Sequence, residues 1–250
     1  MKSARFPIAA ALLFAGSVWL VAAQEPAKPA DKATPSPEAV KAAKEGVESM
    51  KRGDWKKAEE AWNRSVQLEP GNAGAWANLG KVQLQEKNTA AAIVSLEKAV
   101  ALQPALSEAW MALGMAYDSD KAPMRAVSCL TRAVHENPAD ARTRNSLAII
   151  LKKAGWKDAA ESELQKALDL DPRYAEAHFN LAVMYLDRRP PAVEMARRHY
   201  EAARGLGAAP DKDLEVQLAG TEAAASDGPN TVAVPAAASK IPAKPTRKKP

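Results

Sequence analysis

The sequence predicts an all-α fold, a solenoid of about five helix pairs with one further helix at the C-terminal end. Two observations carry this prediction. The hexapeptide AWANLG at 75–80 returns as AWMALG at 109–114, which is 34 residues later. Four prolines follow the same period: Pro70, Pro104, Pro138 and Pro172. A repeat of this length is typical of a protein in which each unit packs only against its neighbours.

Counting each of these prolines as position 32 of a repeat brings the other positions into register. Small and large apolar residues have different roles at these positions. Small ones let two helices approach closely, and large ones fill the space between them. Position 7 is Leu79, Leu113, Leu147 and Leu181, and position 8 is Gly46, Gly80, Gly114, Ala148 and Ala182. Position 20 is Ala58, Ala92, Ala126 and Ala160, and position 24 is Trp62, Leu96, Leu130 and Leu164. Each repeat is therefore expected to form two antiparallel helices, ended by the proline.

The pattern W-x2-L-G-x2-Y, then Ala, a large apolar residue, Ala and Pro, strongly resembles the tetratricopeptide repeat (TPR) family. The best match is the repeat with Trp110, Leu113, Gly114 and Tyr117. The resemblance implies a right-handed superhelical solenoid within 38–220, with repeats at 39–72, 73–106, 107–140, 141–174 and 175–210 and a capping helix at 211–220. The first repeat is degenerate, since Ala42 replaces the Trp. The last fits only with two residues inserted near 190–191, which puts Ala196, Tyr200 and Ala203 at positions 20, 24 and 27.

The N-terminus predicts export. Lys2 and Arg5 precede an apolar run at 8–21, and small residues lead up to Ala23. This pattern is typical of a signal peptide over residues 1–23, cleaved after Ala23, and of a periplasmic or cell-envelope protein. The alternative is an uncleaved membrane anchor, because the run is only slightly shorter than a span of about 20 residues. Residues 24–37 are rich in Pro, Ala and Lys and are expected to be a disordered linker.

The net charge of +5 comes from the ends of the chain. The last eleven residues, KIPAKPTRKKP, hold five Lys and Arg and no acid, in a Pro/Ala-rich tail at 221–250 that is expected to be disordered. The repeats are near neutral, which argues against a nucleic-acid partner. The tail is either a solubilising end or a weak electrostatic contact with an anionic envelope surface.

The sequence contains no recognisable catalytic or metal-binding motif. The three histidines are not at metal-ligand spacing, and no phosphate loop or nucleophile motif occurs. His178 is expected to be partly packed, His199 to be on the exposed side of its helix, and Cys129 to be a buried hydrophobe. We therefore predict no enzyme activity and no cofactor.

The resemblance implies that the first helix of each pair lines a groove that binds a peptide or a helix. In this register the candidate groove residues are Asn78, Lys81, Met111, Met115, Arg142, Asn145, Ile149, Phe179 and Asn180, together with Lys44, Lys152 and Val183. The asparagines are expected to bond a peptide backbone, and the apolar side chains to supply adaptable contacts or to pack only against the next repeat. A clamp for a C-terminal carboxylate is disfavoured, because Glu108 and Ala112 stand where cations would be needed.

Two functions follow. The first is an exported, non-catalytic scaffold or adaptor whose groove binds a protein or peptide partner. The second is a structural or assembly subunit of a cell-envelope complex, which contacts its partners through its end faces and basic tail.

Overall fold

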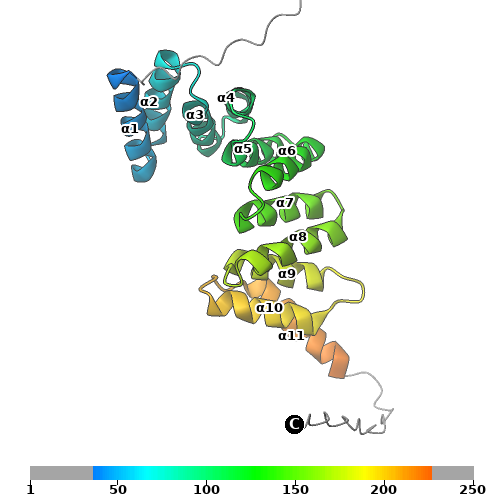
Figure 1. Ribbon diagram of the computed structural model, residues 1–250. Coiled ribbons are helices and arrows are strands. Elements are labelled where there is room, and N and C mark those ends of the chain that lie inside the picture. The colour runs from blue at the N-terminus through cyan, green and yellow to red at the C-terminus, as the bar shows by residue number, and fades with distance from the viewer. Residues whose placement is uncertain (1–35, 227–250) are drawn as a thin grey trace, which may run out of the picture. The chain divides into compact units, whose positions relative to one another are not determined.

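The computed structural model describes the backbone of residues 36–226 and the side chains of 36–220. The predicted signal peptide, nearly all of the predicted linker and the basic end of the tail lie outside these residues. The described part is all-helical, with eleven helices and no strand (Figure 1). The helices are α1 (Pro37–Arg52), α2 (Trp55–Leu68), α3 (Ala73–Gln85), α4 (Thr89–Leu102), α5 (Ser107–Ser119), α6 (Pro123–Glu136), α7 (Ala141–Lys153), α8 (Lys157–Leu170), α9 (Ala175–Leu186), α10 (Val193–Gly205) and α11 (Lys212–Ser226).

The first ten helices form five pairs, as the period predicts. Each first helix (α1, α3, α5, α7, α9) packs most extensively on the second helix of its own pair, and each second helix packs on the first helix of the next pair. From α3 onward, neighbouring first helices also contact one another directly. This nearest-neighbour pattern is that of a solenoid.

Glycine at position 8 allows the two helices of an inner pair to approach closely. A Cβ atom on Gly114 would lie 2.7 Å from Leu130 Cγ, and one on Gly80 would lie 2.5 Å from Leu96 Cγ. Both distances are too short for carbon atoms in contact, so these sites exclude any side chain. Leu96 and Leu130 are fully buried as a result.

Position 4 joins each inner repeat to the proline of the repeat before it. The indole N–H groups of Trp76 and Trp110 donate to the carbonyl oxygens of Pro70 and Pro104, at 2.9 and 2.8 Å. Both tryptophans are half-buried, whereas we expected side chains that fill the space between helices. The indole nitrogen must reach a polar partner near the surface, and this keeps part of the ring exposed.

The ends of the repeat array differ slightly from the predicted bounds. Helix α1 begins at Pro37, inside the predicted linker, with the Ser36 side chain accepting the backbone N–H of Ala39. Helix α11 continues to Ser226, which is beyond the predicted end at 220, and buries Leu214 and Leu218. The turn between α9 and α10 covers residues 187–192, where the other pairs have shorter turns, so the two-residue insertion lies where the alignment put it.

The predictions for Cys129 and His199 have different outcomes. Cys129 is buried and free, as predicted, and burial raises the pKa of its thiol to about 11. The prediction for His199 was wrong: its ring is half-buried and lies against His178 and Tyr185. With the two inserted residues counted, His199 is at position 23 of the last repeat. The repeat pattern did not show that this position faces the neighbouring helix.

Candidate functional site

Two cavities lie along the first helices and meet at one residue. The first, which we call the Met115 cavity, has a volume of about 380 Å³. Its walls come from α3, α5, α6 and α7: Lys81, Leu84, Gln85, Met111, Ala112, Met115, Asp118, Ser119, Leu130, Ser146, Ile149 and Ile150. The second, the Phe179 cavity, has a volume of about 820 Å³. It lies between α7, α9 and the turn before α11, and is lined by Asn145, Ile149, Arg173, Ala175, Glu176, Phe179, Asn180, Leu206, Gly207, Ala208 and Ala209.

Most of the predicted groove residues line one of these cavities. Ile149 lines both, so the two cavities adjoin at this residue and together extend along α3, α5, α7 and α9. Five of the predicted groove residues line neither cavity: Lys44 and Arg142, which are exposed, and Asn78, Lys152 and Val183, which are half-buried. That the lining residues bind a peptide stays a prediction.

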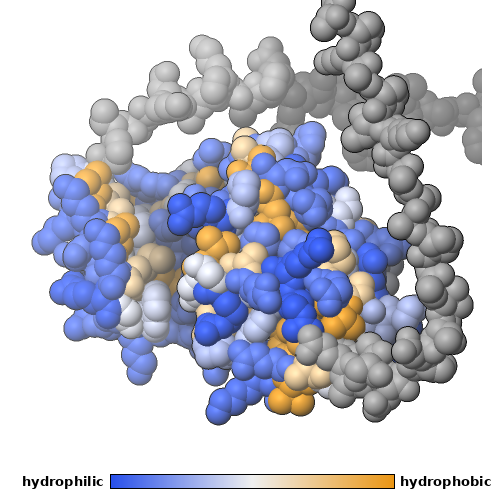
Figure 2. All heavy atoms as spheres, turned by 90° about the horizontal axis from the view of Figure 1, so that it is seen from below, coloured by the Kyte–Doolittle hydropathy of each residue, from blue (hydrophilic) through white to orange (hydrophobic). Residues whose placement is uncertain are grey.

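Position 9 carries an exposed apolar side chain on three of the five first helices, and two of these side chains line the groove. Met115 is 49% exposed and Ile149 37% exposed, both at position 9 of their helices. Val47 holds the same position on α1 and is 41% exposed. The face seen from below the view of Figure 1 is mainly hydrophilic, and its apolar areas are separated by hydrophilic side chains (Figure 2). A repeated apolar position on one helix face is typical of a binding surface.

Two of the three predicted asparagines, Asn145 and Asn180, bond each other. The Asn180 side-chain amide donates to Asn145 Oδ1 at 2.8 Å, and the Asn145 amide lies 3.4 Å from the hydroxyl oxygen of Tyr174. Asn145 is only 6% exposed. Burial, followed by the nearby Glu176 carboxylate, raises the pKa of Tyr174, which keeps its hydroxyl neutral. These amides therefore tie α7 to α9 across the floor of the Phe179 cavity.

Charged groups at the rim join neighbouring first helices. Lys81 on α3 pairs with Glu108 on α5 at 2.7 Å, and Lys153 on α7 pairs with Asp118 on α5 at 2.5 Å. The hydrogen bond from Lys81 lowers the pKa of Glu108. Lys81, predicted as a ligand-binding cation, already has an anionic partner from the next repeat.

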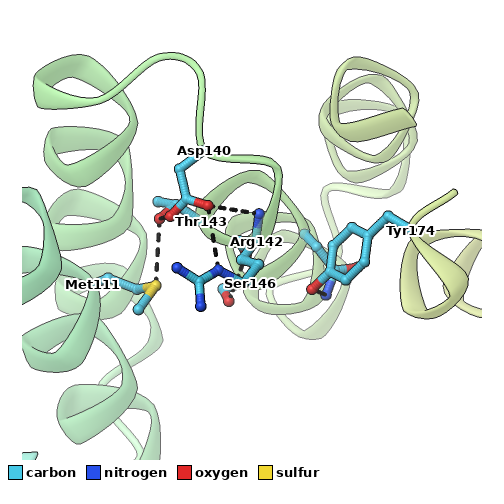
Figure 3. A network of polar contacts seen from close by, with 7 residues as sticks. Met111, Asp140, Arg142, Thr143, Ser146 and Tyr174 are labelled. Carbon is cyan, nitrogen blue, oxygen red and sulfur yellow. Dashed lines mark hydrogen bonds and ion pairs between the residues drawn. The ribbon is translucent and has the colours of Figure 1, made fainter. Parts of the chain in front are cut away.

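A cluster around Asp140 connects α5 with the start of α7 (Figure 3). Asp140 accepts the backbone N–H of Arg142 at 3.1 Å and the hydroxyl of Thr143 at 2.6 Å. Burial raises the pKa of Asp140, but these bonds outweigh that effect and hold it below the usual value. The Thr143 hydroxyl has one proton, so its 3.3 Å approach to the Met111 sulfur is a packing contact. The cluster fixes the Met111 wall of the groove.

The far wall of the Phe179 cavity was not predicted from the sequence. This wall is the turn at Leu206–Ala209, together with Arg173 and Glu176. The small residues of the segment GLGAA were the available signal, since small side chains leave room beside a helix row. Their position against α7 and α9 depends on how α10 packs, which no local pattern shows.

Nothing in the described residues suggests chemistry at this site. Among residues 36–220, no group of three or more His, Cys, Asp and Glu side chains is placed to hold a metal ion. In the same part of the chain, no helix is long and apolar enough to cross a membrane.

Models of the tetratricopeptide repeat match residues 49–116, 141–174 and 163–204, which together span more than half of the chain. The chain belongs to the tetratricopeptide repeat family. No curated protein matches it.

Solved structures with the same TPR fold include three distant relatives. MamA from Desulfovibrio magneticus RS-1 is 21% identical, with 69% of this chain and 97% of that chain covered and a TM-score of 0.61. Pseudomonas aeruginosa PilF is 19% identical, with 76% and 86% covered and a TM-score of 0.67. YrrB, described as a TPR protein with an unusual peptide-binding site, is 22% identical, with 74% and 92% covered and a TM-score of 0.57. At these identities the likeness shows the fold.

Proposed function

We propose that this TPR protein is a non-catalytic interaction scaffold that binds a peptide or helical segment of another protein in the groove formed by the Met115 and Phe179 cavities. The observation that carries the proposal is that the two cavities meet at Ile149, an exposed apolar residue, and are lined from four successive repeats. The ion pairs at the rim and the asparagine bonds of the Phe179 cavity hold the helices of the groove in place before a ligand arrives. A groove that is already formed loses little conformational entropy on binding.

The partner segment is expected to offer apolar side chains. Met115, Ile149 and Phe179 provide contacts for them, and methionine adapts its shape to different ligands. The polar groups near these residues are largely bonded to one another. They therefore help to orient a bound segment more than they attract it by charge. The peptide-binding site named for YrrB supports this class of partner.

The described end of the array at α1 favours the groove over the end faces as the contact surface. Positions 3, 7 and 10 are Lys41, Glu45 and Glu48 on α1, where α5 has the buried residues Ala109, Leu113 and Ala116. A face that carries charge at every one of these positions interacts well with water and poorly with another apolar surface.

Selection of peptides from a random displayed library tests the proposal. Peptides enriched on the wild-type protein are labelled, and their dissociation constants are measured by fluorescence polarisation. We expect Ile149→Glu to weaken binding at least tenfold, because it places a charge between the two cavities. The matched control is Val94→Glu, which changes a 65% exposed apolar residue on α4, outside both cavities.

The control variant is expected to bind like the wild type. Equal weakening by Val94→Glu and Ile149→Glu, or no weakening by either, would remove the groove as the binding site. Far-ultraviolet circular dichroism of both variants shows whether the helices are retained.

We further propose that the protein is exported and cleaved after Ala23. The support is the sequence of residues 1–23, with its charged start, apolar run and small residues before the cleavage point. The intact mass of the protein purified from its native cells measures this. The expected N-terminal residue is Gln24, and a chain that retains Met1 in the membrane fraction would instead establish the anchor.

A further inference from the structure

Two of the three histidines contact each other inside the last helix pair. His178 on α9 and His199 on α10 place their Nδ1 atoms 2.9 Å apart, with ring centroids separated by 5.1 Å. Both rings are half-buried. This distance is that of a hydrogen bond, which requires one nitrogen to carry a proton and the other to have none.

The neighbouring repeats show which nitrogen carries the proton. His178 is at position 4, where Trp76, Trp110 and Arg144 each donate an N–H to the carbonyl of the preceding proline. His178 Nε2 lies 3.1 Å from the carbonyl oxygen of Pro172 in the same way. A carbonyl only accepts, so Nε2 of His178 carries its proton. Its Nδ1 in the neutral ring is then the acceptor, and Nδ1 of His199 is the donor.

The groups around His199 come from each element packed against it. On α8, Glu161 accepts the hydroxyl of Tyr185 at 3.1 Å and pairs with Arg188 from the turn before α10. The Tyr185 ring on α9 lies 5.5 Å from the His199 ring. On and before α11, Glu215 and Asp211 contact Tyr200, the residue after His199.

These surroundings make the imidazolium form of His199 unfavourable. Burial, and then the proximity of His178, lower the pKa of His199, and the Glu161 carboxylate opposes them only in part. Glu161 is already engaged by Tyr185 and Arg188.

While the two histidines remain in contact, which we call the closed state, the pair can bind one added proton but not two. The first proton goes to Nε2 of His199 and leaves the Nδ1–H···Nδ1 bond intact. The second would have to go to Nδ1 of His178, where it would point at the proton of His199 across 2.9 Å, between two positive rings. A fully protonated pair is therefore incompatible with the contact.

We propose that the His178–His199 pair is a proton-sensitive latch, which holds α9 against α10 at neutral pH and releases the last helix pair in acid. The open state takes up two protons below the ordinary histidine pKa of about 6.5, and the closed state takes up at most one. Because the open state binds more protons, the closed state is favoured above this pH and loses favour as the pH falls below it. A difference of one proton shifts the equilibrium toward opening by up to about tenfold per pH unit.

Opening of the latch is also expected to weaken ligand binding in the Phe179 cavity, an inference that rests on the proposed function. Phe179, which follows His178, lines the Phe179 cavity, and its ring lies 6.4 Å from that of Tyr200, which follows His199. Separation of α9 from α10 removes this support, so a ligand of the Phe179 cavity is released in acid.

Hydrogen–deuterium exchange of the full chain at pH 7.5 and 5.5 tests the latch. We expect the protection factors of α10, corrected for the intrinsic effect of pH, to fall about tenfold relative to those of α3–α6. The variant His199→Asn should remove this fall, because its side-chain amide can donate through Nδ2 to neutral His178 or turn and accept through Oδ1 from protonated His178, so the closed state binds as many protons as the open state. The control His135→Gln, which changes the exposed histidine on α6, should behave like the wild type.

Histidine titrations by NMR keep the test decisive if His199→Asn does not fold. In the wild type, the His199 resonance is expected to titrate below the ordinary histidine pKa of about 6.5. A His199 resonance that titrates at the ordinary histidine pKa, or α10 protection that follows α3–α6 at both pH values, would overturn the latch. The selected peptides should bind more weakly at pH 5.5 to the wild type and equally at both pH values to His199→Asn. If α10 loses protection in acid but peptide affinity does not fall, only the link between the latch and the groove is overturned. If the proposed function is wrong, Ile149→Glu binds the peptides at pH 7.5 as tightly as the wild type does.

Discussion

The third pair, α5–α6, and the last pair, α9–α10, reach a similar arrangement of two helices through different side chains. In the third pair Gly114 lies against Leu130, and Trp110 donates to the carbonyl of Pro104. In the last pair Ala182 holds the position of Gly114, Tyr200 holds that of Leu130, and a histidine replaces Trp110. The third pair is held by close apolar packing, while the last also contains a hydrogen bond between the rings of two histidines. The difference teaches that one backbone arrangement can be insensitive to pH in one repeat and sensitive in another.

The largest expected effect comes from the large side chain of the third pair. Leu130 has no exposed surface and is surrounded by close packing that a shorter residue cannot restore. We expect Leu130→Ala to lower the free energy of unfolding by about 3 kcal/mol, within the range of about 2–5 kcal/mol for such sites. Urea denaturation followed by circular dichroism measures the change. The control Met124→Ala, at a residue on α6 that is 57% exposed, should stay within about 0.5 kcal/mol of the wild type.

Exchanging glycine and alanine at position 8 of the third and last pairs tests the same comparison, and the expected effect is smaller. Gly114→Ala adds a Cβ atom 2.7 Å from Leu130 Cγ and 3.2 Å from the backbone oxygen of Ala126. We expect it to destabilise by about 1–3 kcal/mol, even though alanine is the better helix former. Ala182→Gly, in the last pair, should destabilise by about 1 kcal/mol, because alanine already fits there and glycine adds only backbone freedom.

The same denaturation experiment reads out both variants. If Gly114→Ala stabilised the protein, the close approach of α5 and α6 would not be required. If Ala182→Gly stabilised it, the last pair would have the same packing constraint as the third, and the comparison would fail.

The fold could be predicted largely from the sequence because its decisive contacts are local and repeated. The period of 34 residues located ten of the helices in pairs, and the small residues at positions 8, 20 and 27 marked where they touch. Even the inserted turn before α10 was placed, since Ala196, Tyr200 and Ala203 returned to register and are buried.

The candidate site was harder to predict because its residues gain their roles from other repeats. Lys81 is paired by Glu108 and Asn145 by Asn180, each from a neighbouring repeat, and the sequence showed only that these side chains can bond something. His199 was expected to be exposed, yet it contacts His178, which is 21 residues earlier.

The sequence by itself determined that this protein is a row of helix pairs, because periodic apolar positions can be buried only by stacking one repeat on the next. The tertiary structure decided where the groove is hollow, which polar groups are already paired, and that two histidines share one proton. Those properties depend on distances of about 3 Å between side chains from different helices, and the spacing of residues along a chain does not encode such distances.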